Sequence, residues 1–118
     1  MAANIRTITA EELKGKMGKD HGLTVINALN KESYDDCRIT GSINIPLDTL
    51  QEKAKTWARD KEIVVYCADE ECPVSRNAFE TLATMGFTNI YAYEGGMREW
   101  KQKGFPSQGA CQADYLKG

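Results

Sequence analysis

Cys67 and Cys72, in C-x4-C spacing, are the residues of this chain best suited to covalent chemistry. Cys67 follows the apolar run at residues 63–66 and precedes a helical pattern, so we expect it in a strand-to-helix loop. In open α/β sheets ligands bind beyond the carboxyl ends of the strands, and N–H groups of the following helix favour an anion there. We therefore predict a lowered pKa and a nucleophilic thiolate at Cys67. The alternative is a buried structural cysteine.

The residues after Cys67 form the predicted active-site loop. It consists of Ala68, Asp69, Glu70, Glu71, Cys72, Pro73, Val74, Ser75 and Arg76. Its carboxylates oppose a thiolate, but exposed carboxylates are screened by solvent whereas loop amides are fixed, so we expect the amides to dominate. A free dianion would have to approach through the acidic side chains, which weakens its binding. The alternative is that residues 69–71 are only a solvated loop tip.

Other sequence features limit the classes of function. The chain has 15 Lys and Arg and 17 Asp and Glu residues, a net charge of −2, which gives no attraction to nucleic acid or an anionic membrane. No signal peptide and no run of about 18 apolar residues is present, so we expect a cytoplasmic protein with no membrane partner. At 118 residues it fits one monomeric domain spanning 1–118, with a core at about 5–106 and a tail at about 107–118.

The remaining cysteines are expected to be unreactive. A reducing compartment favours thiols, so Cys37 and Cys111 are interpreted as bystanders, one buried in a turn and one in the tail. Zinc ligation fits poorly, because Cys67 and Cys72 are the one close pair and the single histidine, His21, lies in a predicted glycine-flanked turn. We expect no metal and no cofactor.

Apolar runs that alternate with helical patterns predict an α/β fold. We expect a central, mostly parallel five-stranded sheet with helices on both faces. The predicted strands lie at residues 5–8, 23–28, 42–45, 63–66 and 89–93, and the predicted helices at 9–16, within 47–60, from the cysteine loop to residue 86, and from 96 to about 104. Thr9 and Glu12 form a capping box. In the tail, Tyr115 and Leu116 are possible anchors, so that segment either packs back or frays.

Four ordered segments resemble the rhodanese family over about residues 5–106. They are VINAL (25–29), ESYDDCRITGSINIPLDTL (32–50), VVYC (64–67) and GFTNIYAYEGGMREW (86–100). The resemblance implies a sulfurtransferase in which Cys67 accepts a sulfane sulfur as a persulfide. Its partners would be a sulfur donor, either a small molecule or a protein persulfide, and a thiol or cyanide-type acceptor.

The chain departs from the family pattern at several positions. The family usually has Asp and Arg where this chain has Asn27 and Leu29, and usually His where it has Arg38. The loop is also longer and acidic, whereas thiosulfate-using members have a short loop with glycine and arginine. We therefore expect a neutral, cationic or protein persulfide donor rather than thiosulfate, with the acidic loop as a docking patch.

Two other functions stay open. If the loop curls around the sulfur as in the family, Cys72 is a possible resolving thiol, and the chain could instead be a redox protein that uses the Cys67 and Cys72 pair. The changes at Asn27 and Leu29 also leave room for a rhodanese-like interaction module with weak catalysis.

Phosphatase-type chemistry requires C-x5-R, and this spacing excludes it. The sixth residue after Cys67 is Pro73, and the sixth after Cys72 is Ala78, so neither cysteine has the arginine that would fork onto an oxyanion. Arg76 is expected in the first turn of the following helix, facing solvent.

Overall fold

The computed structural model describes residues 5–19 and 22–117. Its centre is a parallel sheet of four strands in the order β3-β1-β4-β5. The strands are β1 (Thr24–Asn27), β3 (Ile43–Asn44), β4 (Ile63–Tyr66) and β5 (Ile90–Tyr93). The predicted α/β architecture is confirmed. The prediction of a fifth strand at residues 5–8 is wrong, because Thr7 makes one isolated parallel bridge to Ala92 before the chain turns into a helix.

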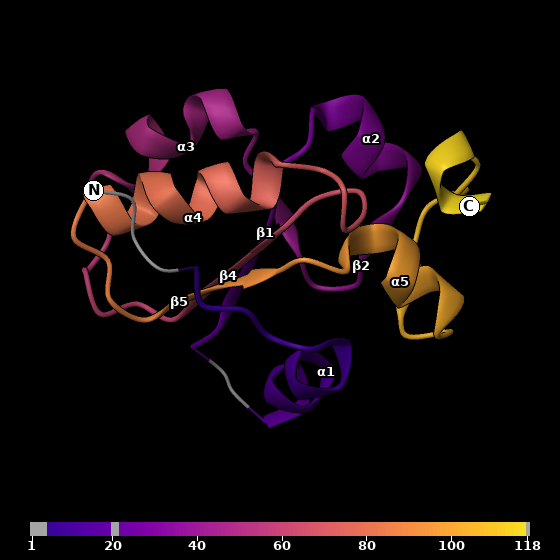
Figure 1. Ribbon diagram of the computed structural model, residues 1–118, viewed down its shortest axis with the longest axis horizontal. Coiled ribbons are helices and arrows are strands. Elements are labelled where there is room, and N and C mark those ends of the chain that lie inside the picture. The colour runs from indigo at the N-terminus through magenta and orange to yellow at the C-terminus, as the bar shows by residue number, and fades with distance from the viewer. Residues whose placement is uncertain (1–4, 20–21, 118) are drawn as a thin grey trace.

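Helices cover both faces of the sheet. Helices α3 (Leu47–Ala54) and α4 (Val74–Thr84) lie on one side and α1 (Ala10–Lys19) on the other (Figure 1). Side chains alternate along β4, so Ile63 and Val65 join the core under α3 and α4. Val64 and Tyr66 join a second core with residues of α1 and of α5 (Gly96–Gln102). Because both faces are covered, β4 is buried along its whole length.

Local capping explains where two helices begin. The predicted capping box of α1 is confirmed, because Glu12 N donates to Thr9 Oγ1 (3.1 Å) and Thr9 N donates to Glu12 Oε1 (3.0 Å). Helix α2 (Lys31–Asp36) was not predicted. Its N-cap is Asn30, whose side-chain oxygen accepts a hydrogen bond from Ser33 N at 2.8 Å.

The tail packs back onto the domain and does not fray, so the first of the two expectations for this segment is confirmed. Strand β6 (Ser107–Gln108) pairs antiparallel with β2 (Arg38–Ile39), and the chain ends in a 3₁₀ helix, η1 (Asp114–Lys117). Leu116 of η1 is buried in the same core as Tyr66.

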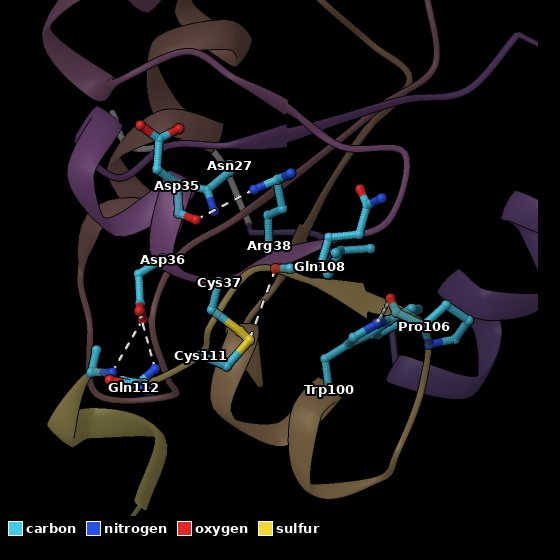
Figure 2. Close-up of a disulfide and its surroundings, with 12 residues drawn as sticks. Asn27, Asp35, Asp36, Cys37, Arg38, Trp100, Pro106, Gln108, Cys111 and Gln112 are labelled. Atoms are coloured by element: carbon cyan, nitrogen blue, oxygen red, sulfur yellow. Dashed lines mark hydrogen bonds between the residues drawn. A yellow bond between two sulfur atoms is a disulfide. The ribbon is translucent and has the colours of Figure 1, made fainter.

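A disulfide joins Cys37 and Cys111, so the prediction that both are unreactive thiols is wrong (Figure 2). The pairing of β2 with β6 brings the two segments together across 74 residues of sequence. Asp36 then fixes the tail: its carbonyl accepts from Cys111 N (2.7 Å) and its carboxylate from Gln112 N (3.0 Å) and Ala113 N (3.1 Å). Disulfides are rare in the cytosol, and the cytoplasmic location stays a prediction.

The tail approaches α2 so closely that one position requires glycine. Gly109 has a positive φ of 107°, and a Cβ added there would lie 2.2 Å from the carbonyl oxygen of Asp36. A side chain at this position would push the tail off α2. Docking of the tail is therefore specified by the backbone as well as by the disulfide.

The hydroxyl of Tyr66 connects the sheet to β2. It accepts hydrogen bonds from Asn27 Nδ2 (3.1 Å) and Ile39 N (3.0 Å) and lies 2.8 Å from Ser42 Oγ. Ser42 Oγ in turn donates to the carbonyl of Ile39 at 2.7 Å. Because a phenol oxygen has two acceptor sites, both filled by N–H groups, its own proton goes to Ser42. Burial is the main cause that raises the pKa of Tyr66.

The part of the chain that the structure describes has neither a candidate membrane span nor a candidate metal cluster. None of its helices combines the length and apolar character that a membrane span needs. No cluster of three or more His, Cys, Asp or Glu side chains within it could hold a metal ion. His21 and its predicted turn lie outside the described residues. The monomeric state stays a prediction.

The disulfide predicts a specific thiol count and a loss of stability when it is removed. Of the 4 cysteines, 2 are free, so thiol titration of the denatured protein should give two thiols without reductant and four after reduction. Replacing both Cys37 and Cys111 by alanine should lower the free energy of unfolding by about 2 to 4 kcal/mol, because the bond constrains the unfolded chain. Urea denaturation measures this loss. A reductant should destabilise the wild type and leave the double variant unchanged; four thiols without reductant would contradict the bond.

Candidate active site

Cys67 lies directly after β4 at the carboxyl edge of the sheet and is fully buried. The first turn of α5 holds its backbone in place. Met97 N donates to the carbonyl of Cys67, and Arg98 N donates to the carbonyl of Ala68, both at 2.9 Å. The start of the loop is therefore fixed by a helix that begins almost thirty residues later in the chain.

This contact requires Gly96. Its φ is +69°, and a Cβ there would lie 2.8 Å from the carbonyl carbon and oxygen of Ala68 and from Asp69 N. The sequence predicts that the last helix begins at this glycine. Its second role, close approach to the loop, was missed, although glycine at such a position was the available signal.

Asp69 organises the loop from inside. Its side chain accepts a hydrogen bond from Glu71 N (3.0 Å), its carbonyl accepts from Cys72 N (3.2 Å), and its carboxylate lies 3.8 Å from Arg98 Nη1. The alternative that this segment is only a solvated tip therefore fails for Asp69. Glu70 and Glu71 are exposed.

The thiol of Cys67 is not the low-pKa group that the sequence predicts. Burial, followed by its interaction with the Cys72 thiol, raises the pKa of Cys67 to about 12. The backbone N–H and hydroxyl of Ser75 act in the opposite direction, but more weakly. Cys67 Sγ also faces a carbonyl, donating to Cys72 O at 3.5 Å. The prediction fails because loss of water around the sulfur outweighs the loop amides.

Cys72 lies against Cys67, as a resolving role would require. Both cysteines are free, Cys72 is half-buried, and its thiol is the second cause of the raised pKa of Cys67. The loop therefore curls back so that a thiol on its rim meets the buried one. The resolving role itself stays a prediction.

The rest of the loop leads into α4. Pro73 precedes the helix, Val74 begins it, and Ser75 is buried beneath the loop. Arg76 lies in the first turn and is exposed, as predicted, and it forms an ion pair with Glu94.

The positions that depart from the family pattern have structural roles. Asn27 is buried, and its side-chain oxygen accepts from Leu29 N (2.9 Å) while its amide donates to Tyr66. Arg38 lies over the ring of Tyr34, with its guanidinium carbon 5.2 Å from the ring centre. Asn27 thereby connects β1 to Tyr66, the residue that precedes Cys67.

An acidic groove borders the loop. It has a volume of about 560 Å³, and its lining includes five glutamates: Glu11, Glu70, Glu71, Glu94 and Glu99. Arg76 also lines it and pairs with Glu94, and Lys103 pairs with Glu11. More carboxylates than cations therefore line the groove.

Comparison with known proteins gives a family for this arrangement. The family model of the Rhodanese-like domain matches residues 9–103. The chain is 28% identical over 102 residues to "Putative sulfur carrier protein YrkF" of Bacillus subtilis, covering 86% of this chain and 54% of that protein. It is 24% identical over 83 residues to thiosulfate sulfurtransferase GlpE of Coxiella burnetii, covering 70% of this chain and 76% of that protein. The chain thus spans about half the length of the first of these relatives.

Solved structures agree with this match. A rhodanese-related protein from Thermoplasma volcanium superposes with a TM-score of 0.74 at 34% identity, covering 87% of this chain and 97% of that one. A protein from Bacillus halodurans gives a TM-score of 0.83 at 24% identity over 93% of this chain and 82% of that one, which shows a shared fold.

The contact between α5 and the loop predicts that a substitution at Gly96 changes the reactivity of Cys67. Gly96→Ala should change the alkylation rate of Cys67 severalfold, because the added methyl group displaces the backbone at Ala68 and Asp69. Gly104→Ala is the matched control, since Gly104 also has a positive φ, of +72°, but no atom lies within 4 Å of its added Cβ. Both variants should lose about 1 to 2 kcal/mol from backbone strain. Equal alkylation rates in the two variants would contradict a loop held by Gly96.

The raised pKa predicts the pH dependence of Cys67 alkylation. The rate with iodoacetamide should rise about tenfold per pH unit from about pH 7 to 10, whereas an ordinary thiol levels off near its pKa of about 8.5. Peptide mass mapping separates Cys67 from Cys72. Cys72→Ala should lower the pKa of Cys67 and speed its alkylation at about pH 8, because one cause of the shift is removed.

The raised pKa of Cys67 also makes the stability of the protein depend on pH. The pKa of Cys67 is higher in the folded than in the unfolded protein, so its contribution to the free energy of unfolding is present at neutral pH and is lost from about pH 8.5 upward. A plateau in alkylation below about pH 9 would contradict the buried, protonated thiol.

Proposed function

Because the chain belongs to the rhodanese-like domain family, we propose that it is a sulfurtransferase that carries sulfane sulfur as a persulfide on Cys67. The observation that carries this proposal is the position of Cys67. Its thiol is buried at the carboxyl edge of the sheet while its backbone is fixed by α5. A sulfur added there would lie inside a loop that shields it from water.

The loading step transfers the outer sulfur of a donor persulfide. The Cys67 thiolate attacks that sulfur, the S–S bond of the donor breaks, and the donor leaves as a thiolate while Cys67 becomes a hydropersulfide. Because burial and the Cys72 thiol raise the pKa of Cys67 to about 12, the thiol is almost entirely protonated at pH 7. A donor that moves the Cys72 thiol away removes one cause of the raised pKa and so favours attack.

The delivery step reverses the roles of the sulfur atoms. An acceptor thiolate, or cyanide, attacks the outer sulfur, the S–S bond on Cys67 breaks, and Cys67 leaves as a thiolate that regains a proton. No metal or redox cofactor takes part, since the electrons of the broken S–S bond stay with Cys67.

The acidic groove supports a donor other than thiosulfate. Glu70 and Glu71 are exposed on the loop that follows Cys67 and line the groove with three further carboxylates. Such a surface repels a free dianion and favours neutral or cationic molecules and basic protein surfaces. The donor is therefore a neutral or cationic persulfide or a protein persulfide, and the acceptor is a thiol.

A thiol redox activity is the second candidate, favoured by the contact between Cys67 and Cys72. In this route the Cys72 thiolate attacks the inner sulfur of the Cys67 persulfide. A Cys67–Cys72 disulfide forms, and the outer sulfur leaves as hydrosulfide. A cellular dithiol then reduces the disulfide and is itself oxidised.

The sulfur-carrier function predicts a mass change that depends on Cys67. After incubation with glutathione persulfide, the wild type and Cys72→Ser should gain one sulfur atom, whereas Cys67→Ser should gain none. Thiosulfate should load the wild type more slowly, and the double variant Glu70→Gln, Glu71→Gln should reduce that difference, because two negative charges are removed. Intact mass spectrometry measures each case, and cyanide should remove the added sulfur.

Other results distinguish the alternatives. Loss of two hydrogen atoms from the wild type but not from Cys72→Ser would support the redox pair. Absence of any sulfur on the wild type with either donor would refute the transferase and leave an interaction module, whose partner binding would survive Cys67→Ser.

A further inference from the structure

Tyr115 in η1 has an unexplained hydroxyl group. Among the residues that the structure describes, this hydroxyl oxygen is the buried side-chain polar atom with no hydrogen-bond partner. Buried polar groups almost always have partners, and leaving one unpaired costs about 1 to 3 kcal/mol. The hydroxyl is therefore available to an acceptor that the empty protein does not itself supply.

The surroundings of the hydroxyl point to the active site. Helix η1 packs against α5, whose first turn holds the backbone of Cys67, and Tyr115 packs against the apolar core that contains Tyr66. Burial first, then the nearby charges of Asp36, Tyr66, Asp69 and Cys67, raise the pKa of Tyr115 to about 12. The phenol is therefore protonated at neutral pH and can donate a hydrogen bond.

Most of the acceptors in this neighbourhood are already engaged. Both oxygens of the Asp36 carboxylate accept backbone N–H groups of the tail. Asp69 accepts from Glu71 N and pairs with Arg98. The Tyr66 oxygen already accepts two hydrogen bonds. The sulfur of Cys67 differs from these groups, because its hydrogen bond to the carbonyl of Cys72 is made as a donor.

The position of Tyr115 is built into the fold. The disulfide and the Asp36 hydrogen bonds fasten the chain just before η1, and Leu116 is buried just after Tyr115. Gly109 lets the tail lie directly on α2. A segment held at this many points presents the hydroxyl in one place.

We propose that Tyr115 donates a hydrogen bond to the outer sulfur of a persulfide on Cys67, so that the disulfide-fastened tail completes the active site. This inference rests on the proposed sulfur-carrier function. In the empty protein the hydroxyl is unpaired, and in the loaded protein it pairs with a sulfur that carries negative charge when the persulfide is ionised. The change favours the loaded state.

The test is the persulfide equilibrium of Tyr115→Phe. The full-length protein is equilibrated with glutathione persulfide and glutathione at several ratios, and the loaded fraction of Cys67 is measured by intact mass. Because a hydrogen bond to a charged group contributes strongly, the loading constant should fall about tenfold to a hundredfold. The melting temperature of the empty variant should equal or exceed that of the wild type, because an unpaired buried hydroxyl is removed.

Tyr91→Phe is the matched control, since the Tyr91 hydroxyl is exposed and bonded to Arg6. It should load like the wild type. Tyr115→Leu also lacks the hydroxyl and should load as weakly as Tyr115→Phe, which keeps the test valid if the phenylalanine variant does not fold.

The outcomes distinguish a failure of the Tyr115 role from a failure of the proposed sulfur-carrier function. Wild-type loading in Tyr115→Phe would overturn the role of the hydroxyl and leave the sulfur carrier intact. A wild type that takes up no sulfur would overturn both. A weaker loading constant with an unchanged or higher melting temperature would support a direct role for Tyr115, because a merely structural residue would not give this combination.

Discussion

The carboxyl edge of the sheet depends on the hydrogen bonds of one buried phenol, Tyr66. Its oxygen accepts N–H groups from Asn27 in β1 and Ile39 in β2, and its proton goes to Ser42. This arrangement joins β4 to the segment that pairs with β6, and so aligns the two halves of the disulfide. The backbone of Cys67, the next residue, leaves the sheet from this fixed point.

Two opposing requirements meet at Cys67. A sulfur carrier needs a sulfur that water does not reach, and burial supplies that protection. The same burial disfavours the thiolate that must attack a donor. Two further groups bear on this balance: the Cys72 thiol, which helps to raise the pKa of Cys67, and the unpaired Tyr115 hydroxyl. In the sulfur transfer proposed above, the Tyr115 hydroxyl gains a hydrogen-bond partner when Cys67 is loaded.

Local patterns predicted much of the fold. Strand β4, the capping box of α1 and the loop around Cys67 follow from apolar periodicity and from residues close in sequence. The tail could not be predicted in this way, because the bond from Cys37 to Cys111 depends on strand pairing across 74 residues. The pKa of Cys67 could not be predicted either, because it depends on burial and on the contact with the Cys72 thiol in the folded loop. The sequence shows that Cys72 is present but not that its thiol faces Cys67.

The distance along the chain between the disulfide partners has a consequence during synthesis. Cys37 leaves the ribosome 74 residues before Cys111, an interval of about 4 to 15 s at ordinary rates of translation. During this interval Cys67 and Cys72 are also made, so Cys37 is exposed to two incorrect partners before the correct one exists. Docking of the tail on Asp36 then brings Cys111 to Cys37. Because the tail docks on the residue next to Cys37, its hydrogen bonds favour the Cys37–Cys111 pairing over a pairing with Cys67 or Cys72.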